Sequence, residues 1–158
     1  MTFTRQLATA AVVGVCLAEV QAAPVLPEHT PSWVHFSTTT HGGVIGDKYT
    51  QPEAVRAAKA GQPLPYGTVI YGIEYEDHNG VRGPVARYIL MEKVKGGGRE
   101  YPASVRNGEW EYASYTPEKQ LITTDTVTRC LACHKSAAAT EYLFGYDKLK
   151  TVTAEVQP

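Results

Sequence analysis

Residues 67–94 decide the fold, and they read GTVIYGIEYEDHNGVRGPVARYILMEKV. Residues 67–76 are rich in β-branched and aromatic side chains and predict a strand, which the turn-forming pair Asn79-Gly80 closes. Residues 85–94 have the same character and predict a second strand. Two strands of this kind that are joined by a short turn form a hairpin, so we expect an antiparallel sheet here.

Further elements are predicted on both sides of this hairpin. Residues 32–40 are aromatic and β-branched, and residues 109–115 alternate polar and aromatic side chains, so each segment predicts a strand. A short helix is predicted over 52–61, with a proline at its start and a glycine at its end. From 125 to about 144 the pattern becomes helical. The predicted class is α+β, a mainly antiparallel β-sheet with a few short helices.

The C-terminal helical segment carries the motif Cys130-Leu131-Ala132-Cys133-His134. At the spacing Cys-x-x-Cys-His, two thiols can bond to the vinyl groups of a haem while the adjacent histidine ligates the iron. Cysteines three residues apart lie side by side on a helix, which is the arrangement that this attachment needs. The sequence therefore predicts one covalently attached haem c, held by Cys130 and Cys133, with His134 as its metal ligand.

Two other chemistries use closely spaced cysteines. A structural zinc site needs four protein ligands, and no second Cys-x-x-Cys and no His-x-x-x-His occurs in the sequence. A thioredoxin-like redox pair is typical of a helix start in a βαβ unit, and the motif follows no such pattern. Both interpretations are weaker than haem attachment.

The N-terminus resembles a secretory signal peptide over residues 1–22. Arg5 precedes an apolar run over 7–18, and small residues follow before Pro24. The run is shorter than the ~20 residues that a membrane span needs. We therefore expect a cleaved signal rather than a stable membrane anchor.

A lipoprotein anchor at Cys16 is the alternative, but Val15 stands where a small residue would be needed. Cleavage after residue 22 leaves residues 23–158 as a single domain with only the two haem cysteines. A chain without a spare thiol suits an oxidising compartment. Together with covalent haem attachment, this predicts a periplasmic protein.

The formal net charge of the chain is −1, with acidic and basic residues interspersed. No basic stripe is present that would bind nucleic acid, and no polybasic patch that would bind a membrane surface. The expected partners are therefore small molecules or another redox protein.

In this sequence the haem motif follows the predicted β strands, which is the reverse of the order in ordinary class I cytochromes c. This arrangement resembles that of the cytochrome P-460 family and its relatives, the cytochromes c′-β. The resemblance covers most of residues 23–158, although the haem motif is its only specific part, and it is carried by these segments: Trp33-Val34, Gly67-Thr68-Val69, Trp110, the haem motif with Lys135, and residues 139–144.

This resemblance implies a β-sheet haem protein that forms a homodimer. Cys130 and Cys133 would hold the haem, His134 would be the proximal ligand, and the distal side would be open or weakly occupied. Family members fall into two groups. The P-460 enzymes oxidise hydroxylamine and carry an extra bond from a lysine to the porphyrin, whereas the c′-β proteins lack that bond and bind nitric oxide and other gases.

Counting from Gly67 places Gly72 at the position of the cross-linking lysine, and glycine cannot form the bond. Lys93 and Lys95 are not obvious substitutes, because one lies in the neighbouring strand and the other near a loop. The resemblance therefore favours a periplasmic cytochrome that binds nitric oxide or a related small nitrogen species. The alternatives are a hydroxylamine-oxidising enzyme that passes electrons to another cytochrome, and a simple electron-transfer cytochrome.

Three residues are candidates for the distal side of the haem. The resemblance aligns Glu92 with a distal carboxylate, where it would be a catalytic base in the enzyme alternative. Met91 is a candidate sixth ligand for the electron carrier, but adjacent strand residues face opposite sides, so at most one of the two can be distal. Phe36 would contact the haem over the open iron face, as aromatic residues do in c′-β proteins. A surface glutamate, a packed core methionine and a core phenylalanine are the respective alternatives.

Overall fold

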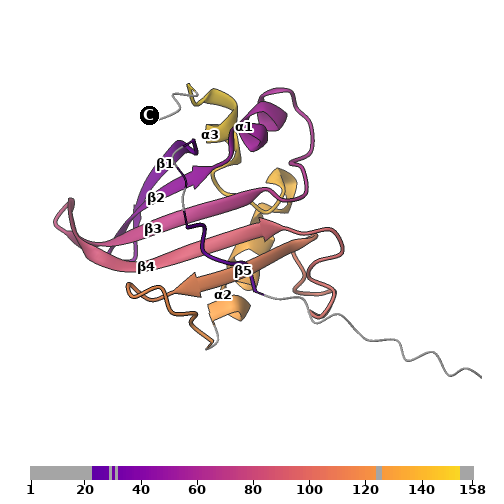
Figure 1. Ribbon diagram of the computed structural model, residues 1–158. Coiled ribbons are helices and arrows are strands. Elements are labelled where there is room, and N and C mark those ends of the chain that lie inside the picture. Colours follow the sequence, from indigo (N-terminus) through magenta and orange to yellow (C-terminus); the bar gives the residue numbers. More distant parts are fainter. Residues whose placement is uncertain (1–22, 29, 31, 124–125, 154–158) are drawn as a thin grey trace, which may run out of the picture.

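The computed structural model describes residues 23–28, 30, 32–123 and 126–153. In this part of the chain, a five-stranded sheet is followed by a C-terminal helical segment (Figure 1). The elements are β1 (Val34–His41), β2 (Val44–Thr50), α1 (Pro52–Lys59), β3 (Val69–His78), β4 (Val81–Lys93), β5 (Trp110–Tyr115), α2 (Thr126–His134), the 3-10 helix η1 (Lys135–Thr140) and α3 (Tyr146–Thr151).

The sheet is an antiparallel meander in the order β1-β2-β3-β4-β5. Two of its hairpins turn through two residues that both have positive φ. Gly42 and Gly43 have φ of 58° and 79°, and Asn79 and Gly80 have φ of 57° and 86°. Glycine and asparagine adopt this conformation readily, and turns of this kind match the twist of the flanking strands.

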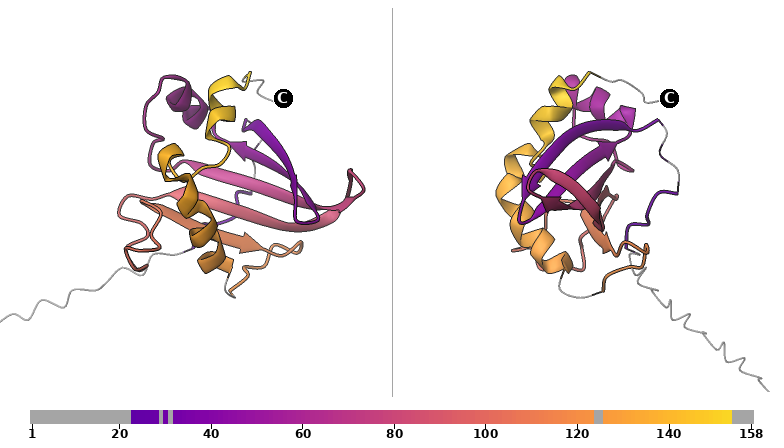
Figure 2. Two further views of the ribbon diagram at one scale, coloured as in Figure 1. Left: turned by 180° about the vertical axis from the view of Figure 1, so that it is seen from behind. Right: turned by 90° about the vertical axis from the view of Figure 1, so that its left-hand side faces the viewer.

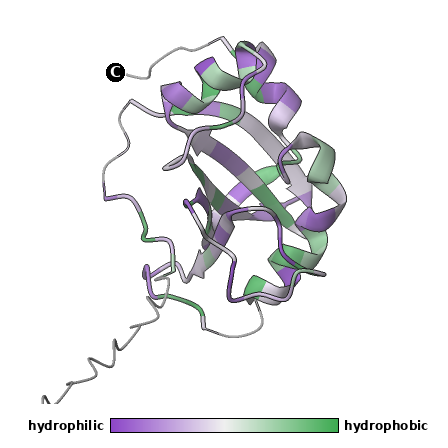
Figure 3. Ribbon diagram, turned by 90° about the vertical axis from the view of Figure 1, so that its right-hand side faces the viewer, coloured by the Kyte–Doolittle hydropathy of each residue, from purple (hydrophilic) through white to green (hydrophobic). Residues whose placement is uncertain are grey.

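One face of the sheet is covered by the C-terminal helical segment, which runs across it from β5 to β1 (Figure 2). Ile70, Met91 and Tyr112 stand opposite one another in register and project towards these helices. The helices carry hydrophobic and hydrophilic residues side by side, as elements with one buried side do (Figure 3). The main core lies between the two layers and consists of Val34, Phe36, Ala54, Val55, Ala58, Leu64, Ile70, Met91, Trp110, Tyr112, Leu131, Leu143 and Leu149.

The opposite face of the sheet carries a row of aromatic side chains. Tyr71 contacts Tyr49, Tyr88 and Trp33, with ring centroids 6.1 to 6.3 Å apart. The N-terminal end of the described chain lies against the same face, where Tyr115 donates a hydrogen bond to the carbonyl of Pro24 at 2.6 Å. The two faces of the sheet therefore have different neighbours.

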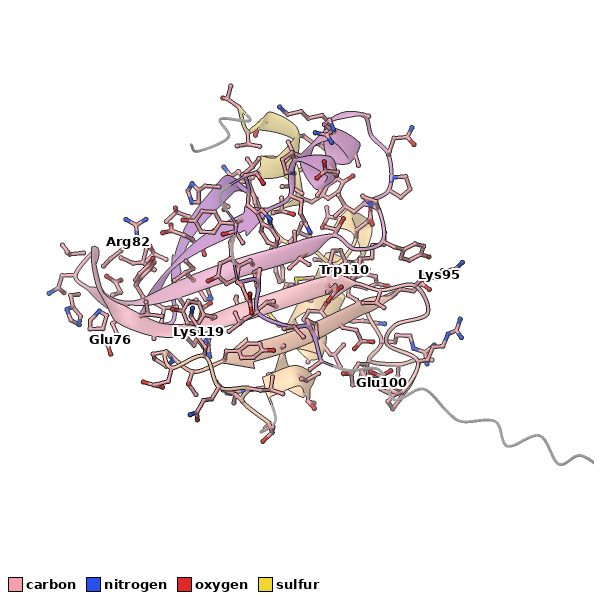
Figure 4. The ribbon with its side chains drawn as sticks, viewed as in Figure 1. Glu76, Arg82, Lys95, Glu100, Trp110 and Lys119 are labelled. Atoms are coloured by element: carbon pink, nitrogen blue, oxygen red, sulfur yellow. The ribbon has the colours of Figure 1, made fainter. Side chains whose placement is uncertain are left out.

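Charged side chains mark both ends of the long β3–β4 hairpin (Figure 4). Glu76 and Arg82 lie at its tip, and Lys95 and Glu100 lie at the far end, near Trp110. No helix among the described residues is long and apolar enough to cross a membrane.

The predicted fold class is confirmed: the protein is α+β, with a mainly antiparallel sheet and short helices. The predicted strands 32–40, 67–76, 85–94 and 109–115 and the helix 52–61 correspond to β1, β3, β4, β5 and α1. Two elements, β2 and α3, were not predicted. The expected signal peptide over 1–22 lies outside the described residues.

Candidate functional site

The haem motif occupies the last turns of α2, which a buried asparagine attaches to the sheet. The Nδ2 atom of Asn107 donates to the carbonyl of Leu131 at 2.9 Å and to the hydroxyl of Tyr112 at 3.0 Å. Leu131 itself is buried in the core. The middle of the motif therefore faces the protein, while Cys130 is half-buried, Cys133 is exposed and both carry free thiols.

His134 is fixed in orientation by its own chain. Glu141 and Tyr142 have positive φ of 51° and 61°, and this turn brings the carbonyl of Tyr142 within 2.6 Å of Nδ1 of His134. A carbonyl only accepts, so Nδ1 carries the hydrogen and Nε2 keeps its lone pair. Burial lowers the pKa of His134, which favours the neutral imidazole. A metal-ligating histidine needs both features.

A cavity of about 720 Å³ opens between the motif and the sheet. Its size is that of an ordinary cofactor or ligand pocket. Both cysteines and His134 line one side, and side chains from all five strands line the other. The strand residues are Phe36, Ser37, Thr39, Thr40, His41, Lys48, Ile70, Gly72, Glu74, Arg87, Ile89, Leu90, Met91, Tyr112 and Ser114.

The residues around this cavity fit a haem. Two thiols at Cys-x-x-Cys spacing and an oriented imidazole face a mostly apolar space, which is the donor set and the environment that a haem c requires. The ring of His134 is flanked by those of Tyr112 and Phe144, with centroid separations of 5.4 Å and 5.1 Å. Burial raises the pKa of the Cys130 thiol, so that it stays protonated in this chain.

The structure places Met91 and Glu92 on different faces of β4, and Phe36 on β1. Phe36 lines the cavity, is 6% exposed and packs against Gly145, so it belongs to the cavity wall and to the core at once. Met91 also lines the cavity. Glu92 does not: it stands in register with Val69 and Glu111, on the face of the sheet away from the haem motif. The expectation of a distal Glu92 therefore does not fit this structure, because the alternation along β4 turns Met91 inward instead.

Three charged strand residues that were not singled out from the sequence lie on the cavity wall: Lys48, Glu74 and Arg87. Glu74 is 2% exposed, and its Oε2 atom accepts a hydrogen bond from Nε of Arg87 at 2.6 Å. Nζ of Lys48 lies 3.7 Å from Oε1 of Glu74. Lys48 was missed because β2 was not predicted, and Glu74 because a glutamate in a strand is ordinarily solvent-exposed.

Gly72, which the resemblance to P-460 proteins aligns with the cross-linking lysine, lies on the cavity wall. Neither Lys93 nor Lys95 lines the cavity. Lys93 points elsewhere and donates to the carbonyl of Leu64 at 2.8 Å and to the carboxylate of Glu141 at 2.6 Å. Two lysines line the cavity: Lys48, from the strand beside Gly72, and Lys148, from α3.

Comparison with known proteins supports the haem interpretation. A search of the curated proteins found no match. The family model of cytochrome P460 matches residues 27–145, which include every strand, the haem motif and the turn that orients His134. The chain thus belongs to the cytochrome P460 family and is a haem cytochrome.

Proposed function

We propose that the protein is a periplasmic mono-haem c-type cytochrome that binds nitric oxide or a related small nitrogen species. The observation that carries this proposal is the cavity of about 720 Å³ beside His134. Gly72 on its wall supports the proposal, because the resemblance aligns this glycine with the lysine that the P-460 enzymes cross-link to the porphyrin. When bound, the haem supplies an iron atom that takes diatomic and nitrogenous ligands. The chain would supply attachment through Cys130 and Cys133, ligation through His134, and an apolar wall that includes Phe36.

Absorption spectra test this function. The chain is co-expressed with haem-maturation machinery and isolated from the periplasm, and the reduced protein is recorded before and after adding carbon monoxide. An ordinary c-type spectrum that shifts with carbon monoxide supports an open ligand site. Absence of the protein from the periplasmic fraction, or of covalent haem after denaturation in acid, contradicts the proposal.

Hydroxylamine oxidation is a second candidate, favoured by the carboxylate of Glu74 on the cavity wall. Glu74 rather than Glu92 would then be the base, although its contact with Arg87 occupies one of its oxygens. A strongly red-shifted spectrum, together with a porphyrin-linked peptide in mass spectrometry, would identify a modified haem and support this enzyme.

Simple electron transfer is a third candidate, because Met91 faces the cavity. Its thioether could be a sixth ligand of the iron. A reduced spectrum that does not respond to carbon monoxide would support this candidate. If the Met91→Ala variant then binds carbon monoxide and wild type does not, Met91 is the sixth ligand.

We also propose a homodimer. The resemblance to P-460 proteins supports it, and so does the aromatic row of Trp33, Tyr49, Tyr71 and Tyr88 on the sheet face away from the haem motif. Aromatic residues are enriched at protein interfaces. Light scattering on the haem-loaded protein measures its mass directly. A mass of two chains supports the dimer, and a mass of one chain at micromolar concentration contradicts it.

A further inference from the structure

Glu141 and Tyr142 form a backbone turn that needs to be held in place. Both residues have positive φ, 51° and 61°, in the left-handed region that residues with a Cβ atom disfavour. The backbone N–H of Tyr142 donates to the carbonyl of Ala137 at 2.8 Å, so the turn follows directly from the end of η1. The same turn aims the carbonyl of Tyr142 at Nδ1 of His134, 2.6 Å away. The orientation of the imidazole therefore depends on what holds this turn.

The carboxylate of Glu141 attaches the turn to two other parts of the fold. Its Oε1 atom accepts a hydrogen bond at 2.9 Å from the backbone N–H of Leu64, in the loop between α1 and β3. Its Oε2 atom accepts one at 2.6 Å from Nζ of Lys93, at the end of β4. Nζ of Lys93 also donates to the carbonyl of Leu64 at 2.8 Å. Three segments that are far apart in the sequence thus meet at one carboxylate.

The ion pair between Lys93 and Glu141 is shielded from solvent. The side chain of Lys93 is 15% exposed and that of Glu141 is 26% exposed, whereas the side chains of the pair Lys150 and Asp147 on α3 are 46% and 81% exposed. Partly buried pairs are screened less by water and salt than exposed ones. Leu64, whose backbone completes the arrangement, is buried in the core. The carboxylate of Glu141 is therefore held in one position, next to the carbonyl that orients the imidazole.

We propose that Glu141 and Lys93 are positioning residues for the haem iron, and that they act on His134 through the carbonyl of Tyr142. A hydrogen bond from Nδ1 to a carbonyl makes the imidazole a more basic ligand. A more basic imidazole binds the iron more strongly and favours its oxidised state, so the ion pair lowers the reduction potential. This inference rests on the proposed ligation of the iron by His134, but it is independent of which ligand the open side of the haem binds.

Resonance Raman spectra of the reduced, haem-loaded protein test this role, because the stretching frequency of the iron–histidine bond follows the basicity of the imidazole. We expect this frequency to fall in both Glu141→Gln and Lys93→Met, since either change breaks the ion pair, loosens the turn and weakens the hydrogen bond from Nδ1. A through-space effect of charge predicts a different result. The two variants remove opposite charges, so such an effect would shift the frequency in opposite directions. The matched controls are Asp147→Asn and Lys150→Met, which remove an exposed ion pair on α3 and should leave the frequency unchanged.

The second readout is the reduction potential of the double variant Glu141→Gln/Lys93→Met, which can be measured whether the iron is five- or six-coordinate. This variant removes one negative and one positive charge, so long-range electrostatic effects largely cancel. We expect its potential to rise above that of wild type, because a less basic imidazole favours reduced iron. The double variant Asp147→Asn/Lys150→Met is the control and should keep the wild-type potential.

Covalent haem content and the midpoint of thermal unfolding confirm that each variant is loaded and folded. Glu141→Gln/Lys93→Gln, which keeps a polar end group at both positions, serves if Glu141→Gln/Lys93→Met loses its haem.

Three results would overturn the inference. An unchanged iron–histidine frequency and an unchanged potential in the loaded variants, with carbon monoxide still bound by the reduced protein, remove the positioning role and leave the proposed function standing. Shifts of opposite sign in Glu141→Gln and Lys93→Met show a through-space effect of charge and exclude the route through Tyr142. Absence of covalent haem from wild type removes both the inference and the proposed function.

Discussion

Glu74 joins two cationic side chains from neighbouring strands inside the sheet. Arg87 on β4 donates to one oxygen of its carboxylate, and Lys48 on β2 lies near the other. A buried carboxylate of this kind keeps two positive charges from facing an apolar space without compensation. Its position between β2 and β4 also connects the strands that form the cavity wall.

Glu74→Gln is therefore expected to lower the free energy of unfolding by about 2 kcal/mol. The side chain of Arg87 is 41% exposed, so solvent screens part of the loss, and the effect stays below that of a fully buried pair. Urea unfolding of the haem-loaded protein measures it. Glu76→Gln is the control, because Glu76 pairs with His78 at the exposed hairpin tip and should change stability by less than ~0.5 kcal/mol. Similar losses in both variants would contradict this account.

Gly72 is required because it has no side chain and so leaves room for its neighbours on the cavity wall. An added Cβ would stand 2.6 Å from Cγ1 of Ile89 and 3.1 Å from Cδ of Lys48. We expect Gly72→Ala to destabilise the protein by about 1–2 kcal/mol, since both neighbours are held on the cavity wall. Thermal unfolding checks this prediction.

Gly83→Ala is the matched control for Gly72→Ala. Its added Cβ would approach the ring of His78 at 2.9 Å, but that ring is 60% exposed and can move aside. The control should therefore lose much less stability. A greater loss in Gly83→Ala than in Gly72→Ala would mean that the space at Gly72 is not what the fold requires.

At the scale of elements, sequence pattern predicted the strands that are rich in aromatic and β-branched residues, and it missed β2. That strand reads VIGDKYT, and its glycine and two adjacent charges lower the strand signal. It forms because Gly42-Gly43 turns the chain back onto β1 and because β3 provides a second partner. Tertiary pairing thus outweighed local propensity.

The sequence pattern also did not predict which side of each strand is buried. Along β3 every hydrophobic or aromatic residue except Ile70 stands at an odd-numbered position, yet the buried positions are Ile70, Gly72 and Glu74. Hydrophobicity alone would have turned the opposite face inward. A glycine and an ion-paired glutamate are buried here because this face lines a cavity, whereas an ordinary core would need to be filled.

Asp47 ties three strands together on the other face of the sheet. It accepts a hydrogen bond from Thr38 on β1 at 2.6 Å and two from Arg82 on β4, at 2.8 Å and 3.1 Å. Burial would raise the pKa of Asp47, but the hydrogen bonds from Arg82 and Thr38 outweigh burial and lower the pKa below its ordinary value. The charged form is therefore the one that the folded state stabilises.

A lowered pKa in the folded state gives stability above the ordinary aspartate pKa of about 3.9, and that stability is lost as the pH falls through the folded pKa. Wild type should therefore lose more stability than Asp47→Asn between pH 5 and about pH 3, while being more stable than Asp47→Asn at pH 7. Urea midpoints at these pH values measure the difference. Asp147→Asn, at a side chain that is 81% exposed, should follow wild type. Parallel acid profiles for wild type and Asp47→Asn would contradict the assignment.

At the scale of the whole molecule, the two walls of the candidate site differ in how much the sequence reveals. The wall formed by Cys130, Cys133 and His134 is local, so a five-residue motif identifies it. The opposite wall combines side chains from five strands, and their arrangement depends on register and facing. Met91 and Glu92 are adjacent on β4 and face opposite sides of the sheet, so the choice between them depends on a facing that the motif does not determine. Lys48 was missed because its strand was not predicted, and Glu74 because a glutamate in a strand is ordinarily exposed.

The same arrangement predicts how the molecule responds to the loss of its haem. β3 and β4 are hydrogen-bonded to strands on both sides, whereas α2, η1 and α3 are held to the sheet largely through side chains around the cavity. Protein produced without haem-maturation machinery should therefore unfold at a lower temperature than the haem-loaded form. Its loss of stability should be concentrated in the C-terminal helical segment, because an occupant that binds only the folded state stabilises the elements that enclose it.

Hydrogen exchange measured by mass spectrometry distinguishes a local loss from a general one. Peptides that cover residues 126–151 should exchange much faster in the haem-free protein, while peptides from β3 and β4 keep most of their protection. Equal loss across both regions would mean that the sheet also depends on the cofactor, and that the cavity wall around Lys48 and Glu74 forms only when the haem is present. Unchanged protection everywhere would mean that the cavity is maintained by the chain alone, without any contribution from its occupant.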